Sequence, residues 1–214
     1  MKNIVISHLK NFLIAVVFSG MSFPAFADFD AGRSAYQQKE YALALKEWQP
    51  LAENGNAEAQ YNLAGMYFQG LGVQQDFHEA ASLFQKAAEQ NFTMAQLSVG
   101  MLYMTGTGGV SKDYGKAMVW LRKAADSGNA TAQLAVGTMY GAGMGVPPND
   151  KEALFWCRES AEQGFAGAQY TLAIMYEAGQ GVSKDHNAAI LLLQKSALQG
   201  FVPAQNMLRA FATK

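Results

Sequence analysis

The sequence of 214 residues is poor in the residues that chemistry most often needs, with one cysteine and three histidines. A single cysteine has no partner for a disulfide within its own chain, which excludes a disulfide-stapled scaffold. The spacings H-E-x-x-H, C-x-x-C and G-x-S-x-G, which mark zinc proteases, zinc or redox sites and hydrolases, do not occur. We therefore expect no catalytic residue, no metal site and no cofactor in a protein that is not an enzyme.

A long apolar run is missing except near the N-terminus, where Phe12–Phe18 follows two lysines. A membrane-spanning helix needs about 20 apolar residues, and serine, glycine and proline interrupt this run early. The stretch Ala25-Phe26-Ala27 has the small-x-small pattern that a signal peptidase needs. We expect residues 1–27 to be a signal peptide cleaved between Ala27 and Asp28, which leaves no stable membrane span. Retention of this segment as an anchor is the alternative.

The charge also excludes one class of partner. Residues 1–27 carry two lysines and no acidic residue, so their removal takes the formal net charge from −1 to −3. A surface of this sign gives no electrostatic attraction toward nucleic acid or anionic lipid. We expect no nucleic-acid partner.

What the sequence does contain is an internal repeat. The pair Ala-Gln recurs at spacings of 36 or 37 residues, at Ala59-Gln60, Ala95-Gln96, Ala132-Gln133, Ala168-Gln169 and Ala204-Gln205. A tyrosine and a glycine-rich turn that ends in valine follow each of the first four pairs at the same distance. We divide the chain into an N-terminal helical pair, four repeats and a C-terminal capping helix, at residues 28–55, 56–91, 92–128, 129–164, 165–200 and 201–214.

Each repeat has the marks of two helices. In the first repeat, apolar residues at helical spacing predict a helix from about Ala59 to Tyr67, and a second from about Asp76 to Gln90. Side chains suited to cap the second helix recur at Asp76, Asp113, Asn149 and Asp185. Residues that enter the left-handed conformation at low cost and so stop a helix recur at Gly55, Asn91, Gly128, Gly164 and Gly200. No stretch predicts a strand, so we expect an all-helical fold.

The glycine-rich turn, seen for example in Gly143-Met144-Gly145-Val146, is not a phosphate-binding loop. A dinucleotide loop needs G-x-G-x-x-G after a strand, and a phosphate-binding loop needs G-x-x-x-x-G-K-[ST]; no copy of the turn meets either. We interpret its glycines as a chain reversal that demands positive φ angles and close backbone approach.

The shared pattern A-Q-x-x-L-[GA]-x-M-Y-x-x-G-x-G-V-x-x-D-x-x-x-A-x-x-W-x-x-K-A-A-x-x-G resembles the Sel-1-like repeat, a relative of the tetratricopeptide repeat. The resemblance covers residues 56–214, and the segment from Gly32 to Ala44 is similar to a tetratricopeptide-style opening pair. It implies a right-handed α-α solenoid of stacked helix pairs, which serves as a scaffold for protein partners. Together with the signal peptide it implies a bacterial periplasmic or secreted protein.

The positions of the first helices that differ between repeats are our candidates for a partner-binding surface. In a stacked array they line the inner surface, and many are large and apolar: Tyr61, Phe68, Met94, Leu97, Met101, Met104, Leu134, Thr138, Tyr170 and Ile174. A tight superhelix would bury these side chains as additional core. A more open one would present them as an adaptable groove for a partner helix or peptide.

Several other residues have less specific expectations. Cys157 aligns with bulky apolar positions, which predicts a buried apolar residue, and His78 and His186 near second-helix starts are expected to be exposed. Pro50 falls inside a second helix and should kink it or loosen its last turn, whereas Pro203 suits a first turn. The basic residues in the last turns of second helices are expected to form a solvated outer face: Lys86, Arg122, Lys123, Arg158 and Lys195.

The sequence therefore predicts an exported scaffold or adaptor that binds a protein or peptide partner of unknown identity on its concave face. One alternative is a structural assembly factor of a cell-envelope complex. Another is a β-lactam-binding or β-lactam-hydrolysing enzyme, as the resemblance implies for cysteine-rich relatives. This chain lacks the cysteine pairs that staple the repeats of that branch.

Overall fold

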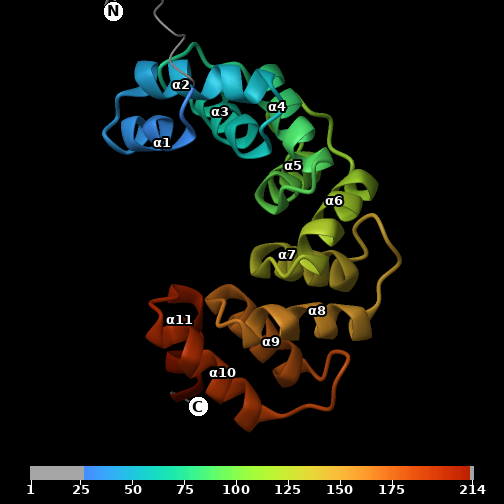
Figure 1. The fold of residues 1–214 in the computed structure, drawn as a ribbon. Coiled ribbons are helices and arrows are strands. Elements are labelled where there is room, and N and C mark those ends of the chain that lie inside the picture. The colour runs from blue at the N-terminus through green and yellow to red at the C-terminus, as the bar shows by residue number, and fades with distance from the viewer. Residues whose placement is uncertain (1–26, 213–214) are drawn as a thin grey trace, which may run out of the picture.

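The computed structural model describes residues 27–212, and within this range the chain forms eleven helices and no strand (Figure 1). The expected signal peptide lies almost wholly outside the described residues. The expected all-helical fold is confirmed. The helices are α1 Phe29–Gln37, α2 Tyr41–Glu53, α3 Ala57–Gln69, α4 Phe77–Glu89, α5 Thr93–Thr105, α6 Tyr114–Asp126, α7 Ala130–Ala142, α8 Asp150–Glu162, α9 Ala166–Ala178, α10 His186–Leu198 and α11 Val202–Ala212.

The helices form an open arc, because each packs mainly on the helices before and after it in the chain. Figure 1 shows the second helices of the pairs, α2, α4, α6, α8 and α10, along the outer edge of the arc, and the first helices along its inner edge. The first and last helices, α1 and α11, lie at the two ends of the arc with its open side between them. A helix pair of this size has too little core alone, so stacking builds one continuous solenoid core.

The expected capping residues set the helix boundaries. The side chains of Asp76, Asp113, Asn149 and Asp185 each accept a hydrogen bond from a backbone N–H in the first turn of the second helix. The expected stop residues all have positive φ, at Gly55, Asn91, Gly128, Gly164 and Gly200. First helices are longer than the apolar pattern predicts: α3 begins two residues before Ala59, because Asn56 caps it through the N–H of Ala59.

The glycine turns lie against the preceding repeat, as the demand for close approach predicts. Gly145 has a φ of 73°, and a Cβ placed on it would lie 2.5 Å from the carbonyl oxygen of Tyr114, at the start of α6. Gly181 makes the equivalent approach to the carbonyl oxygen of Asp150, at the start of α8. Only glycine fits such a position, so these two turns hold their repeats in register with the repeats before them.

Alanines let the helices approach closely along the whole core. The alanine of each recurring Ala-Gln pair is fully buried, from Ala59 to Ala204. Cys157 is 1% exposed, which confirms its expected role as a buried apolar residue. Leu208 and Phe211 of α11 pack on the core of the last repeat, and Pro203 lies in the first turn of that helix.

Pro50 does not disturb the end of α2. The helix continues to Glu53, and the N–H groups of Asn54 and Gly55 donate to the carbonyl oxygens of Pro50 and Ala52. The expected loosening of the last turn is therefore wrong, since the carbonyl groups of Pro50 and Ala52 keep their partners, while a kink at Pro50 stays a prediction.

Candidate functional site

The ten candidate residues lie on first helices, and none of them is fully buried. Seven side chains are half-buried and three, those of Met94, Thr138 and Ile174, are exposed. The half-buried ones pack on the core with one side and leave the other accessible. The structure thus lies between the two alternatives: seven of these residues contribute partly to the core, and three are exposed. The role of these residues in partner binding stays a prediction.

A cavity of about 740 Å³ brings three of the ten together. Tyr61 and Phe68 of α3 line it with Met101 of α5, so that two successive repeats contribute to one site. The remaining candidates lie outside this cavity. Residues from the N-terminal pair complete its wall: Arg33, Tyr36, Gln37 and Trp48. Sequence reasoning missed these four, because they precede the repeats whose variable positions were compared.

Aromatic contacts hold the apolar wall of the cavity in place. The ring of Tyr61 lies 5.5 Å from that of Phe84 and 5.2 Å from that of Phe92, and Phe68 meets Phe77 edge to face at 5.2 Å. Such pairs stabilise by about 0.5–1.5 kcal/mol each beyond the area that they bury. A ligand in this cavity would therefore meet pre-positioned rings, which reduces the entropy lost on binding.

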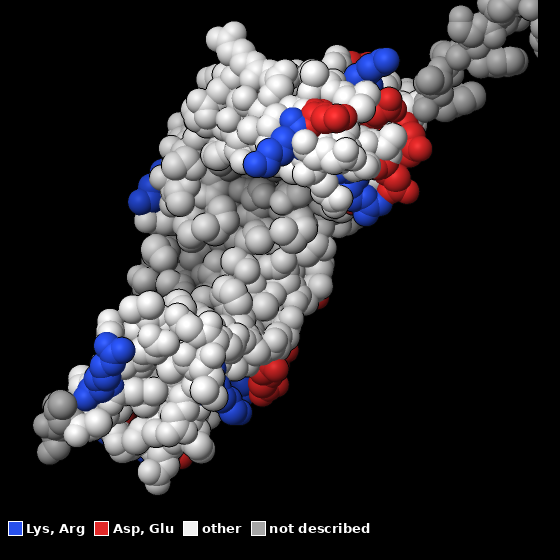
Figure 2. All heavy atoms as spheres, turned by 90° about the vertical axis from the view of Figure 1, so that its left-hand side faces the viewer, with Lys and Arg blue, Asp and Glu red and all other residues white. Residues whose placement is uncertain are grey.

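The inner surface is almost free of charge. Helices α5 and α7 carry no Asp, Glu, Lys or Arg, while α3 has only Glu58 and α9 only Glu177. Charge gathers at the N-terminal end, where Arg33 of α1 and Glu58 both line the cavity. Figure 2 views the molecule from the open side of the arc and shows a hollowed middle of uncharged side chains, with coloured residues gathered above and below it. A charged ligand would lose hydration here with little compensation, which favours an uncharged one.

One polar group of the cavity is open to a ligand. The half-buried carboxamide of Asn62 lies in the cavity wall and has no hydrogen-bond partner among residues 27–212. At the equivalent positions, Ser98 and Thr171 donate to backbone carbonyls of their own helices. A carboxamide offers both a donor and an acceptor, as a peptide group does.

The far end of the inner surface has a second aromatic group. Tyr170 of α9 lies 5.5 Å from Phe201, which packs with the core of the last repeat. Nearby, Oε2 of Glu177 lies at hydrogen-bond distance, 2.7 Å, from Nδ1 of His186, and Oε1 forms an ion pair with Lys184 at 3.3 Å. The His186 hydrogen bond, with help from Lys184, lowers the pKa of Glu177.

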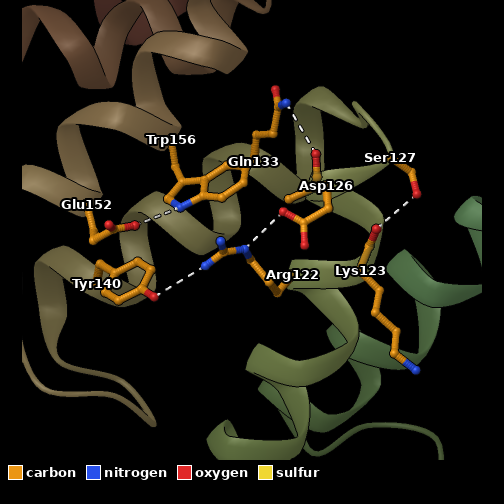
Figure 3. A network of polar contacts seen from close by, with 9 residues as sticks. Arg122, Lys123, Asp126, Ser127, Gln133, Tyr140, Glu152 and Trp156 are labelled. Atoms are coloured by element: carbon orange, nitrogen blue, oxygen red, sulfur yellow. Dashed lines mark hydrogen bonds and ion pairs between the residues drawn. The ribbon is translucent and has the colours of Figure 1, made fainter.

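The basic residues of the outer surface combine solvent exposure with contacts to aromatic rings. The guanidinium of Arg122 lies 4.6 Å from the ring centre of Trp156, and Figure 3 shows it between that ring, the hydroxyl of Tyr140 and the carboxylate of Asp126. Lys123 likewise lies over the ring of Trp120 at 4.2 Å. Four of the five basic residues, Lys86, Lys123, Arg158 and Lys195, are exposed, as expected, and Arg122 is half-buried. Arg122 and Lys123 also cover aromatic rings, which the sequence did not predict.

The described residues offer little for acid–base or metal chemistry. Among residues 27–212, no three His, Cys, Asp or Glu side chains lie close enough to hold a metal ion. Burial raises the pKa of the Cys157 thiol to about 11, which makes it a poor nucleophile. His78 and His186 are exposed, as expected. None of the described helices is long and apolar enough to cross a membrane.

Comparison with known proteins identifies the repeat. The model of the Sel1 repeat matches four times, at residues 57–92, 93–129, 130–165 and 166–201. The chain belongs to the Sel1-repeat family. Each match begins one residue after the repeat boundary that we set from the sequence.

Two solved structures are similar to this Sel1-repeat chain along most of its length. A Sel1 repeat protein from Oxalobacter formigenes is 32% identical, with a TM-score of 0.79 over 85% of this chain and 74% of that one. The protective antigen c5321 of uropathogenic Escherichia coli is 39% identical, with a TM-score of 0.74 over 77% of this chain and 35% of that one.

A curated relative matches over a shorter segment. It is the HRD3 component of the ERAD-associated E3 ubiquitin-protein ligase of Candida glabrata, which is 39% identical over 61 residues. This segment is 28% of the present chain and 7% of that protein.

Proposed function

We propose that this protein is an exported, non-enzymatic scaffold, which holds an uncharged apolar segment of a protein partner on its concave face. The observation that carries the proposal is the 740 Å³ cavity between α1, α3 and α5, whose pre-positioned rings form most of an apolar wall that also includes Arg33 and Glu58, and which opens toward the uncharged faces of α5 and α7. The open carboxamide of Asn62 suits the backbone of a bound peptide. The related HRD3 protein is named as a component of a ligase assembly, which agrees with a role in protein association.

A double substitution tests the concave face. Met101→Glu with Tyr170→Glu places a charge at two points of this surface, and we expect it to abolish capture of partners from an envelope extract. Val119→Glu is the matched control, because Val119 is 56% exposed on the outer helix α6. Helical circular dichroism should be unchanged in both. Undiminished capture by the double variant would show that the partner binds at another surface. Mass spectrometry of the captured proteins would distinguish an adaptor from an assembly factor.

The proposed export has its own test. The backbone N–H of Asp28 donates to Oε2 of Glu47 at 3.0 Å, so cleavage after Ala27 would place the new ammonium group beside this carboxylate. We expect N-terminal sequencing of protein isolated from the cell envelope to begin at Asp28. A retained Met1 would contradict cleavage. A chromogenic β-lactam assay should show no turnover, and clear turnover would overturn the non-enzymatic proposal.

A further inference from the structure

The convex side of the array contains grooves between successive outer helices, and one equivalent position faces into each groove. This position holds a large ring in the two middle copies and leucine in the outer two, as Leu83, Trp120, Trp156 and Leu192. In the groove between α6 and α8, Trp156 is only 5% exposed and lies under the guanidinium of Arg122. The protein itself therefore shows that this type of groove accommodates an indole ring (Figure 3).

The next groove, between α8 and α10, has the same construction without the large ring. Arg158 takes the place of Arg122, and its Nη2 donates to the hydroxyl of Tyr176 at 3.4 Å, as Nη1 of Arg122 does to Tyr140 at 3.5 Å. Leu192 stands where Trp156 stands in the filled groove. A cavity of about 500 Å³ results, and each residue that lines it aligns with one 36 positions earlier around Trp156.

Three features make this cavity accessible to a ligand. Asp126 holds Arg122, whereas Arg158 forms no ion pair with a carboxylate among the described residues. The rim residue Leu191 is 58% exposed, which leaves apolar surface in contact with water. Lys195 adds a second cation to the lining, against one carboxylate, that of Glu162 at the position equivalent to Asp126. Cations beside an apolar cavity attract the face of an aromatic ring.

We propose that the groove between α8 and α10 is a socket for an aromatic side chain of a protein partner, with its ring between Leu192 and the Arg158 guanidinium. The indole N–H of Trp156 donates to Oε2 of Glu152 at 3.2 Å. Ala188 occupies the position equivalent to Glu152, so the acceptor that binds the indole of Trp156 is missing from this position, and the socket takes phenyl as well as indole rings. This socket faces outward and is independent of the concave surface proposed above.

Small probes test the socket directly. In titrations followed through the methyl resonances of Leu172, Leu191 and Leu192, we expect N-acetyl-phenylalaninamide and N-acetyl-tryptophanamide to bind with a Kd on the order of 1 mM. N-acetyl-leucinamide should bind several-fold more weakly, because it lacks the ring that the cations attract. Equal binding of the leucine probe, or no methyl shift with the aromatic probes, would overturn the proposal.

Substitutions provide the structural controls. Leu192→Trp should fill the socket from within and abolish probe binding, whereas Leu83→Trp at the equivalent position of the first groove should leave it unchanged. Ala188→Glu should strengthen binding of the tryptophan probe alone, since it restores the indole acceptor. Arg158→Ala should reduce the aromatic probes to the level of the leucine probe. Wild-type binding by a folded Leu192→Trp variant, or by Arg158→Ala, would contradict the assigned site.

Discussion

The side-chain amide of Gln90 donates a hydrogen bond of 2.8 Å to the side-chain oxygen of Gln60, thirty residues earlier in the chain. The same bond links Gln163 to Gln133 at 2.7 Å and Gln199 to Gln169 at 2.9 Å. Each accepting glutamine is buried and uses its own amide to reach the preceding repeat, as Gln60 does at the carbonyl of Ala52. The bonds between glutamines thus join the two helices of one pair, and the bonds to the alanine carbonyls join that pair to the one before it.

The second repeat breaks this pattern and predicts a stabilising substitution. Ser127 stands where the other repeats have the donor glutamine, and Oε1 of Gln96 is buried without a hydrogen-bond partner among the described residues. An unsatisfied buried acceptor costs about 1–3 kcal/mol. Ser127→Gln should therefore raise the free energy of unfolding by about 1 kcal/mol in chemical denaturation. The reverse change, Gln163→Ser, should lower it by a similar amount, and equal stabilities would refute this explanation.

A glycine in a turn and a glycine inside a helix predict opposite effects on stability for the same substitution by alanine. Gly145→Ala combines a positive φ with a clash against the backbone of Tyr114, so it should destabilise by about 2 kcal/mol or more. Gly65 lies inside α3, and a methyl group added there would meet no neighbouring part of the fold within 4 Å. Gly65→Ala should stabilise by about 0.5–1 kcal/mol, because alanine favours helix. Thermal unfolding of both variants measures the contrast.

The burial of Cys157 predicts its reactivity and a pH dependence. Its thiol is 1% exposed, and burial raises its pKa to about 11 from an ordinary value of 9.0. Between these two pH values the unfolded chain loses a proton that the folded chain keeps, so stability falls as pH rises from 9.0 toward 11. A thiol reagent at neutral pH should modify the unfolded chain and leave the folded one intact. Rapid labelling of the folded protein would contradict this prediction.

The contacts of Glu177 with His186 and Lys184 predict that the stability of the fold depends on pH in the acid range. His186 and Lys184 hold the pKa of this carboxyl below its ordinary value of 4.5, so its contribution to stability is present above that pH and is lost as pH falls further. The ring of His186 also lies 5.1 Å from that of Phe211 in the last helix. Glu177→Gln should therefore lower the thermal midpoint near neutral pH and converge with wild type in acid. A difference in thermal midpoint that stays constant at all pH values would show that the charge of Glu177 is not its cause.

The repeated features of the fold could be predicted from the sequence because each depends on local chemistry. The caps at Asp76 and Asn149 and the stop at Asn91 follow from side chains that bind or tolerate nearby backbone. The accessible faces of Tyr61 and Met101 depend on the curvature of the arc, which small differences at many contacts determine together. The spacing of residues in the sequence therefore could not predict how far these side chains are exposed.

The parts of the surface that the sequence did not reveal depend on differences between repeats. The cavity wall from Arg33 to Trp48 comes from a pair with another turn length, which falls outside the alignment of repeats. The aromatic cover of Arg122 requires a ring from the following repeat. The cavity between α8 and α10 could have been predicted from the sequence by comparing Trp156 with Leu192, because a repeat that lacks the large side chain leaves space at that position.

The contact of Gly181 with the start of α8 fixes how the fourth repeat packs on the third, and Gly145 makes the equivalent contact one repeat earlier. The turn glycines Gly145 and Gly181 rest on backbone atoms of the preceding repeat, whereas Gly109 of the longer second turn meets the imidazole of His78. At the joints of Gly145 and Gly181, the step from one repeat to the next is therefore set by backbone atoms and depends little on side-chain exchange on either face. A whole repeat gained or lost at such a joint would therefore change the length of the solenoid by a constant amount. Substitutions on the inner surface and on the outer surface would leave this step unchanged.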